Sequence, residues 1–182
     1  KFNEVYPNQA FSYQVDRAQF DKILLDHAAS SGVTVYEETT ALAPIGSPPT
    51  VSGARLRDRT GDEFEMEAVL TIDATGQNAL FGRHFRTRTF NEDLRHVALY
   101  GYWSGGRDLP DALPSNDPED SGNILIVTVP DGWVWHIPIA PHIRSVGLVT
   151  DPRVVARLNA ADRTDYYLSQ LGQCVEISAL LA

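Results

Sequence analysis

The sequence has 182 residues, 43% of them hydrophobic, and a formal net charge of −9. This size suits one good hydrophobic core, and the acidic charge excludes a nucleic-acid or anionic-membrane surface, since those surfaces need clustered Lys and Arg. Cys174 is the single cysteine, so no intramolecular disulfide can form, and we expect a reducing, cytoplasmic compartment.

The N-terminal region predicts a strand, a helix and a second strand. Residues 11–15 alternate and are rich in strand formers. Asp16 is a typical helix N-cap, the apolar residues of 17–31 keep helical spacing, and Gly32 stands where a left-handed C-terminal residue belongs. A strand at 33–36 would complete a βαβ unit with parallel strands.

A β-hairpin region follows. Residues 41–43 extend a strand, and the Gly and Pro residues of 46–49 break it. Residues 51–57 are expected to pair with 64–69 across a tight turn.

The segment 68–72 is a continuous apolar run, which is typical of a strand buried on both faces of an α/β sheet. Asp73 and Gly76 follow it and lead into a short helix at 79–85. Open α/β sheets bind nucleotides at such carboxyl ends of strands. The alternative is a capping aspartate and a turn glycine with no ligand.

The next region predicts an antiparallel meander. Its four strands are residues 97–103, 123–129, 132–138 and 143–149. A polar loop at 104–121, which has little to bury, is expected to be mobile.

The C-terminal region reads as two helices. Asp162 or Thr164 would cap the first, Gly172 would end it, and 175–181 would form the second.

Two tryptophans mark the third strand of the meander. Trp133 and Trp135 share one face, because strand side chains repeat with period two, and Ile137 continues that face. Pro138 lacks an N–H, so the strand is expected to end there or to lie at a sheet edge. On residue pattern alone, ordinary core packing is an open alternative.

The string Trp133-x-Trp135-x-Ile137-Pro138 resembles the W-x-W-x-I-P signature of flavin-dependent halogenases. That family is a branch of the FAD monooxygenases with the p-hydroxybenzoate hydroxylase fold. The resemblance implies that both indoles line a wall beside the flavin and keep organic substrate away from it. The halogenating species then travels to a separate substrate pocket.

Arg17 also resembles a position of this family, the arginine of a strand-to-helix junction that approaches the FAD pyrophosphate. A guanidinium at a helix N-terminus supplies bidentate phosphate donors. The alternative is a surface arginine paired with Asp21 one turn later.

Three further cofactor-binding positions follow from the resemblance. The backbone near Ala41 would pass the adenine, and Asp73 and Gly76 would contact FAD. Hydroxylases commonly have Asp-Gly where this chain has Asp73-Ala74, so Ala74 favours the halogenase branch.

The resemblance implies a mixed α/β fold, part of an FAD/NAD(P)-binding βαβ domain joined to an antiparallel substrate-domain sheet. We expect residues 1–86 to belong to the FAD-binding domain with a β-hairpin insertion, 87–150 to form the substrate-domain sheet, and 151–182 to be helical. The sequence has no G-x-G-x-x-G, so we expect a fragment that binds FAD weakly by itself. Neither Lys1 nor Lys22 is assigned the family's catalytic lysine role.

The implied function is FADH2-dependent oxidation of chloride or bromide with O2, which halogenates an electron-rich aromatic substrate, free or carrier-bound, with a separate flavin reductase as partner. Two alternatives stay open, a related FAD-dependent monooxygenase or reductase and a non-catalytic α+β ligand-binding module. No metal is expected, because the five histidines have no ligand spacing. They are His27, His84, His96, His136 and His142.

Overall fold

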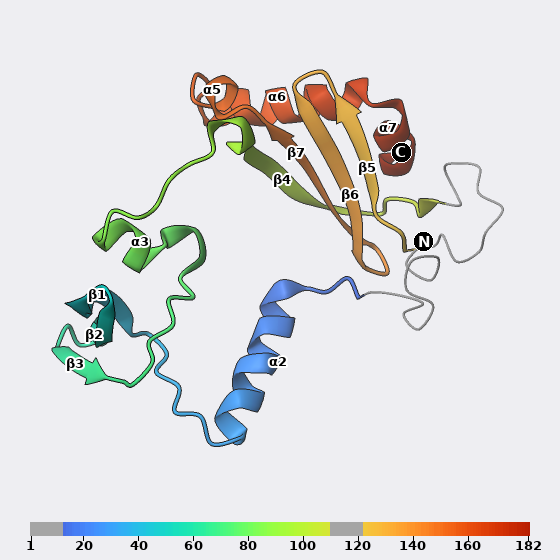
Figure 1. The fold of residues 1–182 in the computed structure, drawn as a ribbon. Helices are drawn as coiled ribbons and strands as arrows, with labels where there is room; N and C mark the ends of the chain where they lie inside the picture. The colour runs from blue at the N-terminus through green and yellow to red at the C-terminus, as the bar shows by residue number, and fades with distance from the viewer. Residues whose placement is uncertain (1–12, 110–121) are drawn as a thin grey trace, which may run out of the picture. The chain divides into compact units, whose positions relative to one another are not determined.

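The computed structural model describes residues 13–109 and 122–182 (Figure 1). The chain divides into two compact units. One contains the residues up to Leu24 together with Asp93–Ala182, and the other is Leu25–Glu92. Among the described helices, none combines the length and the apolarity that crossing a bilayer requires.

The first helix, α2 (Arg17–Ser30), is confirmed, and it ends one residue before the predicted end. Asp16 Oδ1 accepts hydrogen bonds from the amides of Ala18 at 2.9 Å and Gln19 at 3.4 Å, and Gly32 has φ +95°. These contacts are local in sequence, which is why the pattern predicts them.

The strand predicted after α2 is wrong, and the described part of the strand predicted before α2 is not a strand either. Residues 13–15 and 33–36 are irregular, while 11 and 12 lie outside the described residues. A parallel strand needs a neighbour that supplies its hydrogen bonds, and the described residues provide none for these segments. The βαβ unit is therefore absent from the part of the chain that the structure describes.

The hairpin region is confirmed as a three-stranded antiparallel sheet. It consists of β1 (Thr40–Ser47), β2 (Thr50–Arg57) and β3 (Glu63–Glu67), in that order. Asp58 Oδ1 organises the β2–β3 turn by accepting from the amides of Thr60, Gly61 and Asp62 at 2.8–3.0 Å.

The predicted buried strand at 68–72 is also wrong. The segment is irregular, and Val69 is 108% exposed. An apolar run forms a buried strand only where neighbouring strands and helices cover it. The 3₁₀ turn η1 (Gly76–Asn78) follows, and then the predicted short helix, α3 (Leu80–His84), which lies against β1.

The larger sheet lies beyond the 3₁₀ turn η2 (Glu92–Leu94). It contains β4 (Val97–Ser104), β5 (Leu125–Val129), β6 (Gly132–Ala140) and β7 (Ile143–Thr150), all antiparallel, in the order β4-β7-β6-β5. The strands are those predicted, but only β5, β6 and β7 form a meander. β4 pairs with β7, on the far side of the sheet from β5. Most of the predicted polar loop at 104–121 lies outside the described residues.

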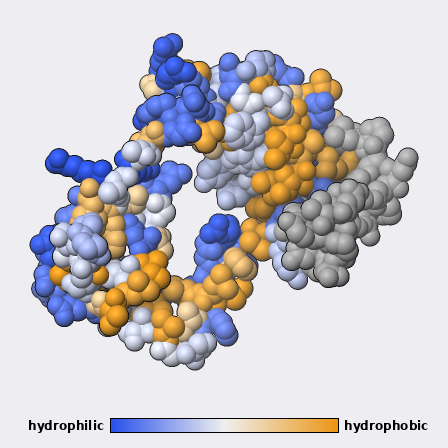
Figure 2. Space-filling view, in the orientation of Figure 1, coloured by the Kyte–Doolittle hydropathy of each residue, from blue (hydrophilic) through white to orange (hydrophobic). Residues whose placement is uncertain are grey.

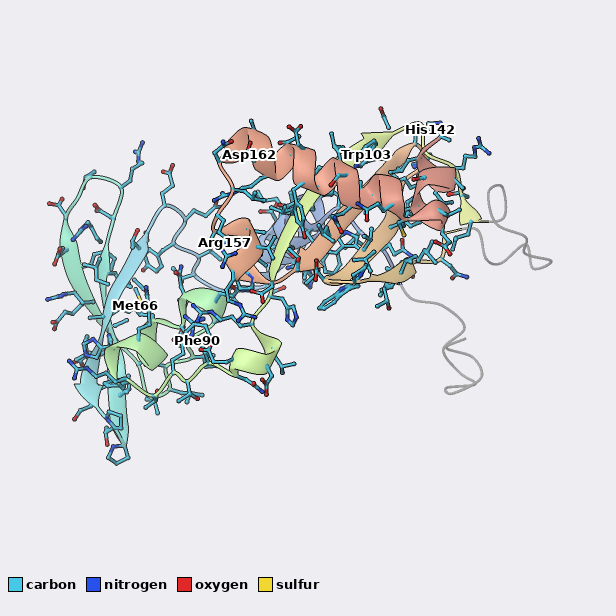
Figure 3. The ribbon with its side chains drawn as sticks, turned by 90° about the horizontal axis from the view of Figure 1, so that it is seen from above. Met66, Phe90, Trp103, His142, Arg157 and Asp162 are labelled. Carbon is cyan, nitrogen blue, oxygen red and sulfur yellow. The ribbon has the colours of Figure 1, made fainter. Side chains whose placement is uncertain are left out.

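Three helices complete this unit: α5 (Pro152–Val155), α6 (Ala160–Gln173) and α7 (Val175–Leu181). Figures 1 and 3 show α6 and α7 against one face of the sheet. The core between them combines residues of the strands and of both helices. It contains Val134, Val146, Leu148, Tyr167, Leu171, Cys174 and Ile177.

The caps of α6 differ from the prediction. Asn159 is the N-cap, and its Oδ1 accepts from the Asp162 amide at 3.0 Å. Asp162, Thr164 and Gly172 lie inside the helix, which ends at Gln173 with Cys174 as its C-cap. Asn159 is as good a cap as Asp, so the sequence offered several N-cap positions of similar quality.

Candidate functional site

Strand β6 separates two environments. Val134 and His136 point to the helices and are buried, whereas Trp133 and Trp135 are partly buried on the opposite face. The shared face of the two indoles and the opposite placement of His136 follow the predicted period of two. Full burial of both indoles would have favoured a non-catalytic module, but both are only partly buried.

We call the side of the larger sheet that α6 and α7 do not cover the open face. Tyr100 is 62% and Tyr102 is 68% exposed there, and their rings meet edge to face with centroids 6.1 Å apart. Trp133 has the His96 ring at 5.1 Å, and Trp135 has the Tyr100 ring at 6.3 Å. In the view of Figure 2, hydrophobic side chains gather over β5 and β6. The open face is thus an aromatic surface built from several strands.

Sequence reasoning missed His96, Tyr100 and Tyr102 as members of this surface. The alternation of β4 shows that the two tyrosines share a face, but not that β4 pairs with β7. That pairing connects residues about 50 positions apart, for which the sequence carries no local signal.

Ile137 continues the tryptophan face, as predicted, and Pro138 departs from its prediction in part. The strand does not end at Pro138 but runs to Ala140. However, β5 pairs with β6 only from Gly132 to His136, so beyond His136 one side of β6 is a free edge among the described residues. A proline is tolerated there because no ladder bond is lost on that side.

Arg17 lies at the exposed start of α2. Its Nε and Nη2 donate to the two carboxylate oxygens of Asp21 at 3.1 and 3.0 Å. This is the local ion pair that the alternative interpretation expects. Both side chains are largely exposed, so the pair contributes little to stability, and the guanidinium is free to change partners.

Asp73 organises the turn before α3. Its Oδ1 accepts from the Thr75 hydroxyl at 2.6 Å and the Thr75 amide at 3.0 Å, and its Oδ2 accepts from the Phe81 amide at 2.8 Å. The bond from the Thr75 hydroxyl, together with these amides, lowers the pKa of the Asp73 carboxyl below its ordinary value. A fixed carboxylate therefore faces this turn.

Gly76 and Ala41 belong to the same unit as Asp73. Gly76 has φ +59°, and a Cβ built on it would meet nothing within 4 Å, so the turn is open to a ligand on that side. Ala41 pairs with Leu56 on β1, just before a register shift. The roles given to these two residues and to Asp73 stay predictions.

The predicted site residues thus form two groups. Arg17 and the W-x-W-x-I-P strand belong to one unit, while Ala41, Asp73 and Gly76 belong to the other. Among residues 13–109 and 122–182, no three His, Cys, Asp or Glu side chains gather as a metal site would require. The chemistry available is that of an aromatic surface, an exposed guanidinium and an open glycine turn.

These residues fit a flavin dinucleotide in character. Guanidinium groups bind pyrophosphate, glycine turns allow a close approach to a nucleotide, and indoles can pack against a flat aromatic ring. The W-x-W-x-I-P motif and these residues together indicate the class of flavoproteins.

Comparison with known proteins identifies the family. The profile of the family described as "Tryptophan halogenase" matches residues 2–173. The flavin-dependent halogenase armH3 of Armillaria mellea is 34% identical over 160 residues, which cover 85% of this chain and 31% of that protein. The 1H-pyrrole-2-carbonyl-[peptidyl-carrier protein] chlorinase of Pseudomonas fluorescens is 34% identical over 142 residues, which cover 77% of this chain and 31% of that protein.

Solved structures agree. The structure of CmlS, a flavin-dependent halogenase, matches 94% of this chain and 30% of its own, with a TM-score of 0.82 and 34% identity. The chain therefore belongs to the tryptophan halogenase family of flavin-dependent enzymes, whose cofactor is FAD. It spans about a third of the length of the curated relatives it matches.

Proposed function

We propose that the complete protein is an FADH2-dependent halogenase that oxidises chloride or bromide with O2 and halogenates an electron-rich aromatic substrate. The observation that carries this proposal is the position of the motif. Trp133 and Trp135 lie together on the open face, in a chain of the halogenase family. The closest alternative activity is that of a related FAD-dependent monooxygenase or reductase.

The indoles act as a wall. Two large flat side chains side by side exclude water and organic molecules from the surface they cover. Ile137 extends the apolar area, and Tyr100 adds a ring next to Trp135. A reactive species formed on one side of such a wall meets its organic substrate only after leaving that side.

Four residues would hold the cofactor. Arg17 would exchange Asp21 for the pyrophosphate, and the open turn at Gly76, fixed by the Asp73 carboxylate, would admit FAD. The backbone at Ala41 would border the adenine. When bound, reduced FAD supplies two electrons, so that O2, a halide, a proton and an aromatic C–H give a C–halogen bond, two waters and oxidised FAD.

Names of the relatives guide the substrate proposal. One acts on a pyrrole held by a peptidyl carrier protein, and another is named tryptophan 2-halogenase, from Chondromyces crocatus. We extend this to a small electron-rich aromatic ring, free or carrier-bound. A separate flavin reductase would supply reduced FAD in the cytoplasm, and a lysine other than Lys1 and Lys22 would relay the halogen.

The test uses the complete protein with a flavin reductase, NADH, O2, and chloride or bromide. Free indoles, phenols and pyrroles, and a pyrrole on a carrier protein, are supplied as substrates, and products are identified by mass spectrometry. We expect a halogenated product that needs halide, O2 and reductase together. Hydroxylated products, or flavin oxidation with no halogenated product in either halide, would favour the monooxygenase alternative.

A further inference from the structure

One of the two indoles, that of Trp135, lies on the main chain of strand β7 at Gly147, and we call this place on the main chain the seat. Gly147 pairs with Trp135 across β6 and β7. A Cβ built on Gly147 would lie 2.2 Å from Cζ2, 2.4 Å from Cη2 and 2.5 Å from Cε2 of Trp135. Real Cβ atoms do not approach other atoms this closely, so the indole lies flat on the main chain, where any side chain at 147 would be.

The requirement for glycine comes from the indole and not from the backbone. Gly147 lies inside a regular strand, and its φ is outside the left-handed region. An alanine would therefore adopt the same backbone without strain. What it would displace is a rigid bicyclic ring.

A hydrogen bond fixes the rotation of this ring. Trp135 Nε1 donates to Ser145 Oγ at 3.2 Å, two residues before Gly147 on the same face of β7. On the neighbouring strand, the Tyr100 ring lies 6.3 Å away, tilted by 33°. The indole is thus held from below by Gly147, along its edge by Ser145 and beside Tyr100.

We infer that Gly147 and Ser145 are positioning residues for Trp135: the missing side chain sets the depth of the indole and the hydroxyl sets its rotation. This inference rests on the proposed function in that the positioned ring is the flavin wall. The W-x-W-x-I-P motif fixes which residues form the wall, and these two residues of β7 fix how one of them is presented.

The chain supplies a matched control at Gly101. This glycine also lies inside a strand of the same sheet, but a Cβ built there would meet its nearest atoms at 3.8 Å, an ordinary contact. Gly101→Ala should therefore measure the general effect of alanine in this sheet. Gly147→Ala measures that effect together with the loss of the seat.

The first measurement is thermal unfolding of the complete protein in a double-mutant cycle. Gly147→Ala should lower the unfolding midpoint more than Gly101→Ala does in the natural sequence. In a Trp135→Leu background, the two alanine variants should shift the midpoint equally, because no indole is left to displace. If Gly147→Ala and Gly101→Ala shift the midpoint equally in both backgrounds, Gly147 does not act as the seat of Trp135. This outcome does not depend on whether the protein is a halogenase.

The second measurement is the ratio of halogenated product to hydrogen peroxide in the reductase-coupled reaction. A displacement of about 1 Å can cost up to about 100-fold at an active site, so we expect Gly147→Ala to lower the ratio about tenfold. Ser145→Ala should lower it less, and Ser145→Thr, which keeps a hydroxyl, should restore it. An unchanged ratio in Gly147→Ala would overturn the positioning role, and absence of halogenation by the unsubstituted protein would instead refute the proposed function.

Discussion

The two faces of the larger sheet use the same strands for different purposes. On the face covered by α6 and α7, Val134 and Val146 are fully buried, and they lie beside helix residues that are buried as well. On the open face, alternate residues of the same strands present Trp133, Trp135 and Tyr100, all partly or largely exposed. A period of two thus lets one strand carry stability on one side and a ligand-facing surface on the other.

The largest expected effect is on the covered face. Ile177 of α7 is 0% exposed, and Val175, two residues earlier, is 77% exposed. Ile177→Ala should lower the free energy of unfolding by about 3–4 kcal/mol, because it removes buried methyl groups and leaves a cavity. Urea unfolding of the complete protein measures it, with Val175→Ala as control. A loss as small as that of Val175→Ala would mean that α7 does not pack against this face.

A smaller effect is expected from a buried hydroxyl on the same face. Tyr167 Oη donates to the Val146 carbonyl at 2.9 Å and accepts from Trp103 Nε1 at 3.0 Å, and Figure 3 shows Trp103 beside α6. Tyr167→Phe removes both of these buried hydrogen bonds and should cost about 1–3 kcal/mol of unfolding free energy. The matched change Tyr102→Phe, on the open face, should cost little. Equal losses from the two variants would remove the distinction between the faces.

Features that depend on local sequence neighbours are those that the sequence could predict. The cap at Asp16, the left-handed glycine at Gly32 and the shared face of Trp133 and Trp135 depend on neighbours within a few residues. Such features follow from residue type and spacing, and they were predicted. They include the motif that carries the proposed function.

Features that depend on distant partners were not predicted. The apolar run at 68–72 indicates burial, but burial requires other strands to cover it, and Val69 is fully exposed. The pairing of β4 with β7 brings Tyr100 beside Trp135, and the register of β6 on β7 places Gly147 under that indole. Registers between strands are set by the packed sheet, so the sequence alone does not place Gly147 under Trp135.

The covered face should also respond to pH through His136, which is 1% exposed and has no hydrogen-bond partner among the described residues at either ring nitrogen. Burial lowers the pKa of His136 below its ordinary value, and Arg144 adds to this effect, while Asp108 opposes it. The unfolded chain therefore takes up a proton at a higher pH than the folded chain. Above a pH of about 6.5, His136 therefore does not lower the free energy of unfolding. Below that pH, its protonation lowers the free energy of unfolding by at most about 1.4 kcal/mol per pH unit.

The measurement is the free energy of unfolding from pH 5 to pH 8, in the protein as it is and with His136→Leu. We expect the variant to lose the part of the acid slope that His136 causes, and His142→Gln, at the exposed β6–β7 turn, to keep it. Parallel pH curves for all three proteins would show that His136 is not the group that titrates.

The smallest effect on stability is expected on the open face, at Tyr102. Its ring is largely exposed and meets only the edge of Tyr100 among the described aromatic residues, so Tyr102→Ala should change the free energy of unfolding by about 0.5 kcal/mol or less. If the open face borders flavin or substrate in the complete protein, the same variant should alter the Michaelis constant or the ratio of product to peroxide while the protein stays fully folded. A stability loss as large as that of Ile177→Ala would show that this side of the sheet is covered and structural. The assignment of stability to one face and of ligand contact to the other would then be wrong.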